Sequence, residues 1–183
     1  MAEVAWGDLI IGQLGFYWDV HLWPRLAGLT DEEYLWEPVT DCWTLRPAED
    51  GGGLRADGGW PEPSPPPVTT IAWRMTHLAI GCFAERTALF FDGPAPAVDL
   101  PGTAAEGVAY LEQTYRAWFD VISALDGEGL AQPLGAKGGP YAREPMAALI
   151  VHLNREVMHH GGEIGLMRDL YRATAADAHR LRG

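Results

Sequence analysis

Apolar residues recur every three or four positions in four long stretches of the chain. These stretches cover residues 8–26, 69–91, 103–125 and 145–171, and the spacing is the period of a helix that is buried along one face. No stretch shows a convincing two-residue alternation of the kind typical of strands. Because amphipathic helices bury their apolar faces against one another, we predict an all-α fold, a four-helix bundle, in a single domain over residues 1–183.

Capping residues mark where the helices begin. Thr30 and Glu33 form a T-x-x-E capping box that opens a short helical turn, and Thr103 forms a second box with Glu106 at the third long helix. Thr69 is the predicted N-cap of the second long helix. These signals agree with the apolar periodicity about where each helix starts.

A segment rich in glycine and proline separates the first two long helices. It covers residues 38–67 and is long enough to form a crossover connection, and within it CWTLR and GLRAD could pair as a small hairpin. Its Trp43 and Trp60 either cover a site at one end of the bundle as a lid or plug the open end of the core. The C-terminal residues 173–183 are expected to fray.

Composition narrows the classes of function. The chain has 183 residues, 48% of them hydrophobic, and a formal net charge of -12 at pH 7. Such a charge repels phosphate backbones and disfavours nucleic-acid binding. No apolar run approaches the roughly 20 residues that span a bilayer, and the N-terminus lacks the regions of a signal peptide.

The two cysteines, Cys42 and Cys82, are far apart and lack the spacing of a metal site, so both are expected to be free thiols in a reducing compartment. Together with the charge and the lack of a membrane span, this predicts a soluble cytoplasmic protein. We expect its partner to be a small molecule rather than a nucleic acid or a membrane, and a homodimer remains open.

The candidate chemistry is concentrated in residues 151–168, which hold three of the six histidines. His160 continues the apolar stripe of this helix, and Glu156 lies one turn before it. At this spacing the two Cβ atoms are about 6 Å apart, so both side chains could reach one ion. A buried carboxylate needs a partner, and a divalent cation would satisfy both groups. The stripe consists of Leu149, Leu153, Val157, Ile164 and Met167.

Other interpretations of the same helix remain open. A Glu four residues before a His also occurs as an ordinary pair on a solvated helix face. His152 lies two turns before His160, about 12 Å along the axis, which is too far to share one small ion. Glu156 and His159 also form the Glu-x-x-His element of di-iron bundles, but the chain holds no second copy.

A third ligand could come from the second long helix. His77 sits beside the apolar stripe there, and the small residues Gly81 and Ala84 on the same side would leave room for an ion and a ligand. Alone, such a histidine is more often a packed core residue. Facing Glu156 and His160, it would complete three protein ligands and leave a fourth position open, which is the catalytic pattern for zinc.

Three sequence stretches, LTDEEYLWEPV, TIAWRMTHLA and NREVMHHGGEIGLMRDLY, resemble the DinB-like (YfiT-like) superfamily of metalloenzymes. The resemblance implies a four-helix bundle with up-down-down-up topology. It implies that His77 matches the family's first metal ligand and that His160, before GGEI, matches the last. Glu156 stands where the family more often has a histidine, and this variant is similar to the His-Glu-His set of mycothiol-dependent maleylpyruvate isomerases.

This resemblance predicts a divalent-metal-dependent enzyme, with Zn²⁺ or Ni²⁺ held by His77, Glu156 and His160. It would use mycothiol or a related low-molecular-weight thiol for S-transfer or isomerisation, because coordination converts a thiol into its nucleophilic thiolate. Two alternatives use the same residues. One is a metal-dependent hydrolase that activates water, and the other is a non-catalytic metal-binding stress protein.

Overall fold

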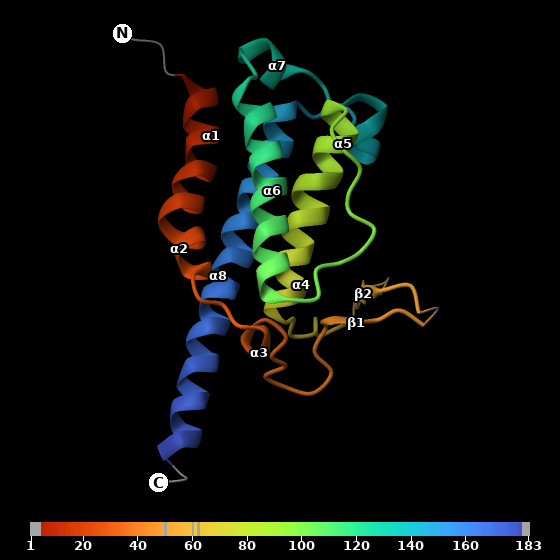
Figure 1. The fold of residues 1–183 in the computed structure, drawn as a ribbon. Coiled ribbons are helices and arrows are strands. Elements are labelled where there is room, and N and C mark those ends of the chain that lie inside the picture. Colours follow the sequence, from red (N-terminus) through yellow and green to blue (C-terminus); the bar gives the residue numbers. More distant parts are fainter. Residues whose placement is uncertain (1–4, 50, 60, 62, 181–183) are drawn as a thin grey trace.

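Four long helical segments lie side by side in the computed structural model, which describes residues 5–180 except 50, 60 and 62 (Figure 1). Two of them contain a π-helical turn. The first segment comprises α1 (Trp6–Tyr17), the π-helical Trp18–Leu22 and α2 (Trp23–Leu26). The second comprises α4 (Ile71–Thr76), the π-helical His77–Ala84 and α5 (Glu85–Phe91). The third is α6 (Ala104–Ser123) and the fourth is α8 (Met146–Arg180). The predicted all-α class is therefore confirmed.

The connections differ from the prediction. The long connection between α2 and α4 begins and ends at the same end of the molecule, whereas the connection from α5 to α6 runs along the helices to the other end (Figure 1). The predicted crossover in residues 38–67 is therefore wrong. Residues 92–103 can span the length of α6 because an extended chain covers about 3.3 Å per residue and a helix only about 1.5 Å.

Aromatic rings fill the core between the first segment and α6. Trp18 stacks on Tyr115 with ring centroids 3.7 Å apart and an interplanar angle of 3°. Trp118 is fully buried and meets the edge of Phe91 at 5.8 Å. Full burial of a large apolar side chain stabilises a fold by about 2–3 kcal/mol, so these rings hold the helices in the register that positions the site.

The predicted caps are largely observed. The Thr30 hydroxyl accepts a hydrogen bond from the Glu33 amide at 3.3 Å and caps α3 (Asp31–Tyr34). At α6, Thr103 and Glu106 form a complete capping box. The N-cap of α4 is Thr70 rather than Thr69, since it is the Thr70 hydroxyl that accepts from the backbone of the first turn.

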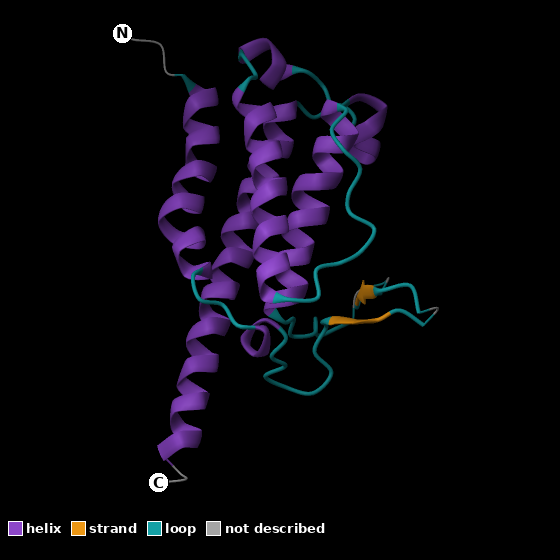
Figure 2. Ribbon diagram, in the orientation of Figure 1, coloured by secondary structure: helices purple, strands orange, loops and turns teal. Residues whose placement is uncertain are grey.

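The predicted hairpin is also present (Figure 2). Strand β1 (Leu45–Pro47) pairs antiparallel with β2 (Leu54–Ala56), and Leu45 lies opposite Ala56. The Asp57 carbonyl that follows β2 accepts a hydrogen bond from the Trp73 indole nitrogen at 2.7 Å. The hairpin is thereby attached to α4 one turn before His77.

Helix α8 is longer than expected. We expected residues 173–183 to fray, but the helix continues to Arg180, in keeping with the high helix propensity of the alanines there. Near its middle, Arg168 makes a buried ion pair with Glu33, with N–O distances of 2.8 and 2.9 Å. No helix in the described part of the chain is long and apolar enough to cross a membrane.

Two short elements join α6 to α8. Asp126, which follows the third predicted helix directly, caps the start of α7 (Gly127–Ala131), where its carboxylate accepts from the Gly129 amide at 2.8 Å. A 3₁₀-helical segment, Gly135–Tyr141, follows before α8 begins.

Candidate metal centre

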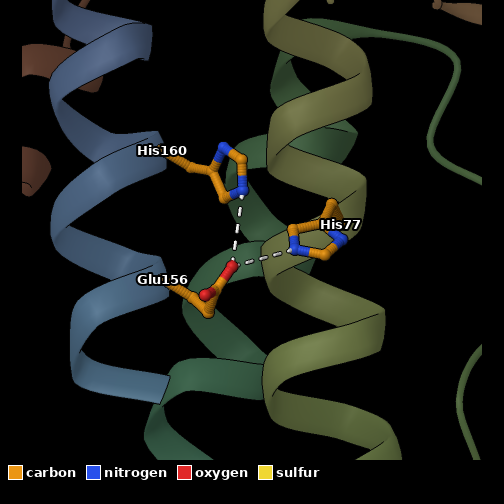
Figure 3. Close-up of side chains that lie close together, drawn as sticks. All are labelled: His77, Glu156 and His160. Atoms are coloured by element: carbon orange, nitrogen blue, oxygen red, sulfur yellow. Dashed lines mark ion pairs between the residues drawn. The ribbon is translucent and has the colours of Figure 1, made fainter. Parts of the chain in front are cut away.

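The structure brings the three predicted ligands together. Oε2 of Glu156 lies 3.8 Å from Nε2 of His77 and 3.7 Å from Nε2 of His160. All three ligand atoms lie within 4.8 Å of one another. Figure 3 shows the carboxylate of α8 between the two imidazoles, one from each helix. The sequence placed these residues on facing helices, and in the structure the helices do face each other at this point.

The neighbouring core residues fix the position of the cluster along the helices and its exposure to solvent. Leu153, Val157 and Ile164 are fully or almost fully buried, so the adjacent turns present Glu156 and His160 at the edge of the core. The side chains of His77 and Glu156 are 35% and 25% exposed. A small molecule can therefore approach the cluster from solvent.

Glu163 controls the orientation of the His160 ring. Its Oε2 lies 2.8 Å from Nδ1 of His160 and 2.9 Å from Nε of Arg74. The hydrogen bond from His160 and the charge of Arg74 lower the pKa of Glu163 to about 2, against an opposing effect of burial. Because the ionised carboxylate only accepts hydrogen bonds, Nδ1 carries a proton, and in the neutral ring Nε2 keeps the lone pair that can bind a metal ion.

Aromatic packing and burial set the state of His77. The ring stacks on Trp73 with centroids 5.4 Å apart and an interplanar angle of 6°. Burial, reinforced by the nearby His160, lowers the pKa of His77, while Glu156 acts in the opposite direction. A lower pKa means that the imidazole is neutral at physiological pH. A neutral imidazole is the form that binds metal ions.

The π-helical turn brings a cysteine to the site. Sγ of Cys82 lies 3.8 Å from Nε2 of His77. The two residues are five apart, and the backbone hydrogen bonds of a π-helix join residues five apart, whereas those of an α-helix join residues four apart. Burial, together with the charge of Glu156, raises the pKa of the Cys82 thiol to about 12. The side chain is therefore a protonated thiol at neutral pH.

Gly81 lies beside the imidazole ring of His77. A Cβ atom added to Gly81 would lie 3.6 Å from Nδ1 of His77, at ordinary contact distance and beside the ring nitrogen that faces away from Glu156. Gly81 therefore does not create the space between the ligand atoms.

Two further histidines of α8, His152 and His159, lie next to the cluster without joining it. Nδ1 of His152 lies 3.6 Å from Oε1 of Glu156, beside the cluster rather than in it, as its distance from His160 along the helix predicted. Nε2 of His159 lies 3.5 Å from Oε1 of Glu163, and His159, His160 and Glu163 form a second potential metal group. In that group Glu163 already accepts from Arg74 and His160, so fewer lone pairs remain for an ion.

The donor set suits a divalent cation. Two neutral imidazoles and a carboxylate are the usual ligands of zinc in sites with three protein ligands. Metal bonds of about 2.0–2.1 Å in a tetrahedral site would put neighbouring ligand atoms about 3.3 Å apart. The observed 3.7 and 3.8 Å separations need only a small adjustment of side chains. The residues therefore fit a metal such as Zn²⁺ or Ni²⁺.

The predicted lid is close to the site on one side. Trp43 packs against Trp73 with centroids 5.8 Å apart, and Trp73 in turn covers His77. Trp60 lies outside the described residues. In the described part of the segment, the ring of Trp73 thus separates Trp43 from the candidate ligand His77.

Comparison with known proteins gives one match. A family model described as the DinB superfamily matches residues 20–164, which include all three candidate ligands. The chain belongs to the DinB superfamily. The resemblance noted in the sequence is confirmed at this level, and membership is compatible with a metal-dependent enzyme. The narrower likeness to mycothiol-dependent isomerases stays a prediction. No curated protein and no solved structure matches the chain.

Two residues of this DinB-superfamily site were not foreseen from the sequence. Glu163 and Arg74 act through His160 rather than as ligands. Their spacing was visible, since Glu163 follows His160 by three residues and Arg74 precedes His77 by three. On a helix these spacings place side chains on one face, and metal-binding histidines regularly donate their second N–H to a carboxylate.

Proposed function

We propose that this DinB-superfamily protein is a divalent-metal-dependent enzyme in which His77, Glu156 and His160 hold Zn²⁺ or Ni²⁺. The observation that supports this most is the convergence of two imidazole Nε2 atoms on one Glu156 oxygen, while Nδ1 of His160 is held by Glu163. An ordinary surface ion pair would not need a second, partly buried carboxylate that is itself paired with an arginine.

The chain's residues prepare the site for such an ion. Glu163 holds the proton at Nδ1 of His160 and so keeps Nε2 available. Burial keeps His77 neutral, and Trp73 fixes its ring plane by stacking. Because these contacts are made without the ion, little ordering entropy would be lost when it binds.

We further propose that the substrate chemistry uses a low-molecular-weight thiol of the mycothiol type, for S-transfer or isomerisation. A divalent cation coordinated here would convert a bound thiol into its thiolate at neutral pH. The protein's own nearby sulfur is Cys82, whose thiol is buried and keeps its proton. The nucleophilic sulfur is therefore expected to come from a small molecule that reaches the partly exposed His77 and Glu156.

The four long helical segments would then form the four-helix bundle that the family resemblance implies. The protein would act in the cytoplasm, on a small molecule. A metal site built from the facing second and fourth segments is typical of helix bundles.

The test is turnover by metal-loaded protein of an electrophile, 1-chloro-2,4-dinitrobenzene or maleylpyruvate, with mycothiol, bacillithiol or glutathione. We expect turnover with at least one thiol and its loss in His77→Ala. Equal rates in the two proteins would exclude the metal from the reaction. Absence of turnover with every thiol, with the metal bound, would favour the hydrolytic or the non-catalytic alternative.

A further inference from the structure

A cavity of about 450 Å³ opens one helical turn along α8 from Glu156. It lies between α5, the 3₁₀-helical segment and the start of α8. Its volume is in the range of small-molecule sites, about 300–1,000 Å³. The residues that matter here are Arg86 and Phe90 from α5, Lys137 from the 3₁₀-helical segment, and Leu149, His152 and Arg155 from α8.

The cavity is cationic in a strongly acidic protein. The chain carries a net charge of -12 and only 13 lysines and arginines, yet three of these 13, Arg86, Lys137 and Arg155, line this one cavity. Glu144 is the only carboxylate among the lining residues. Such a concentration of positive charge on an acidic molecule favours an anion.

Two of these cations have no carboxylate partner. Among the described residues, no carboxylate lies within ion-pair distance of Arg86 or Lys137, although most other arginines of the protein have one. The buried Nε of Arg86 also has no hydrogen-bond acceptor. A buried polar group without a partner costs about 1–3 kcal/mol, which a bound anion near the guanidinium would reduce.

His152 lies between the cavity and the candidate metal centre. Its Nδ1 accepts a hydrogen bond from the Arg155 guanidinium at 2.6 Å and lies 3.6 Å from Oε1 of Glu156. His152 is therefore both a wall of the cavity and a neighbour of a candidate ligand. A molecule that fills the cavity would end close to the cluster of His77, Glu156 and His160.

We propose that this cavity binds the carboxylate or phosphate group of the ligand whose reactive end lies at His77, Glu156 and His160. Arginine binds such groups through a planar fork of N–H donors, and Phe90 and Leu149 supply apolar walls for the chain that joins the two ends. In assigning the reactive end to the metal centre, the inference rests on the proposed function. Anion binding by the cavity itself does not.

Binding to metal-free protein tests the cavity alone. We would titrate succinate, inorganic phosphate and the uncharged succinamide by isothermal calorimetry into wild type, Arg86→Gln, Lys137→Gln and Arg172→Gln. Lys137 is exposed, so its variant is expected to fold even if Arg86→Gln does not. Arg172 is an exposed arginine 17 residues beyond Arg155 on α8, roughly 25 Å along the helix, and serves as the control.

We expect succinate or phosphate to bind and succinamide not to bind. Loss of one charge-assisted hydrogen bond should lower the affinity for the anion about tenfold or more in Lys137→Gln and in Arg86→Gln. The affinity of Arg172→Gln should be unchanged. The preferred anion identifies the group as carboxylate or phosphate. Failure of both anions to bind wild type, or equal affinity in wild type and Lys137→Gln, would overturn the proposal.

Turnover by metal-loaded protein identifies which reactant carries the anion. Mycothiol, which has no carboxylate, would be paired with the dicarboxylate maleylpyruvate, and bacillithiol, which has carboxylates, with the uncharged 1-chloro-2,4-dinitrobenzene. The KM of the anionic reactant should rise about tenfold in Lys137→Gln. Unchanged KM values would contradict the proposal that the cavity binds the anionic reactant, but would leave the proposed reaction standing. Anion binding without turnover by wild type would contradict only the proposed reaction.

Discussion

Nδ1 of His160 lies 2.8 Å from Oε2 of Glu163, and this contact decides which nitrogen of the imidazole faces Glu156 and His77. The carboxylate also accepts from Nε of Arg74 at 2.9 Å, so α4 and α8 are joined one turn from the candidate ligands. The state of the ring that would bind an ion therefore depends on two residues that are not ligands.

Replacement of Glu163 by glutamine should weaken metal binding without removing a ligand. Loss of such a supporting carboxylate typically costs about 10–100-fold in metal affinity. Zinc affinity would be measured by competition with a chromophoric chelator in wild type and Glu163→Gln. Glu128→Gln, at an exposed position of α7, is the control and should bind as wild type. Equal affinities in all three proteins would contradict the role of Glu163.

The same residue predicts a pH dependence of stability in the metal-free protein. The pKa of Glu163 is lowered from 4.5 to about 2, first by the hydrogen bond from His160 and then by the charge of Arg74. The ionised form therefore stabilises the fold at neutral pH, and the contribution is lost as the pH falls from about 4.5 to about 2. Because the side chain is one-third exposed, we expect about 1–2 kcal/mol.

Urea unfolding of wild type and Glu163→Gln measures this difference. At pH 7 the variant should be the less stable protein, and the gap should narrow steadily below pH 4.5. A gap that stays constant down to pH 2.5 would mean that the carboxylate's charge is not what stabilises the native state.

Elemental analysis distinguishes the two overlapping metal groups of α8. Since His160 belongs to both groups and His159 to one, we expect one metal ion per chain in wild type and in His159→Ala, and its loss in His160→Ala and His77→Ala. Loss in His159→Ala with retention in His77→Ala would show that the ion instead binds at Glu163. His152→Ala should also keep the metal, since the ring of His152 lies near Oε1 of Glu156 and not near the Oε2 that faces His77 and His160.

Cys82 should not be a ligand, despite its distance of 3.8 Å from Nε2 of His77. Its sulfur does not belong to the group of ligand atoms that lie within 4.8 Å of one another, and burial, which raises the pKa of the thiol to about 12, opposes its ionisation. Cobalt-substituted protein is therefore expected to lack a sulfur-to-cobalt charge-transfer band, and Cys82→Ala should keep its metal. A near-ultraviolet band that disappears in Cys82→Ala would show the opposite.

The sequence predicted the helices well because burial along one face leaves a regular pattern. Thr30 and Thr103 were located by their chemistry, but Thr70 was missed by one residue because two adjacent threonines carry the same capping chemistry. Amphipathic spacing gives the axis of a helix and not its direction, so it did not locate the crossover from α5 to α6. The up-down-down-up order that the family resemblance implies does require a crossover there. The continuation of α8 to Arg180 was not expected, because the apolar stripe that marks this helix in the sequence ends at Met167.

The candidate ligands were predictable because His77, Glu156 and His160 each lie beside an apolar stripe. The π-helical turn was not, because its effect is a change of period within a helix that keeps its apolar character. It moves Cys82 next to His77, where α-helical spacing would have put it on another face. The cavity cations Arg86, Lys137 and Arg155 come from three elements, and only the packing of those elements brings them together.

The last prediction concerns the two glycines after His160. A Cβ atom at Gly161 would lie 2.7 Å from the hydroxyl oxygen of Tyr17 and 2.8 Å from its ring, whereas one at Gly162 would meet no atom within 4 Å. Gly161 thus allows the first helical segment to approach α8, where the Tyr17 hydroxyl donates to the Met158 carbonyl at 3.1 Å.

Gly161→Ala should therefore destabilise the fold by about 1–3 kcal/mol through overpacking. Gly162→Ala should stabilise it by about 0.5–1 kcal/mol, because alanine loses less conformational entropy in a helix. Urea unfolding of the metal-free variants measures both values. In the double variant Tyr17→Phe with Gly161→Ala, removal of the hydroxyl should recover part of the loss, since the two changes affect one contact. If Gly161→Ala is as stable as Gly162→Ala, the first segment is free to move away from α8, and the close approach next to His160 is not required for the fold.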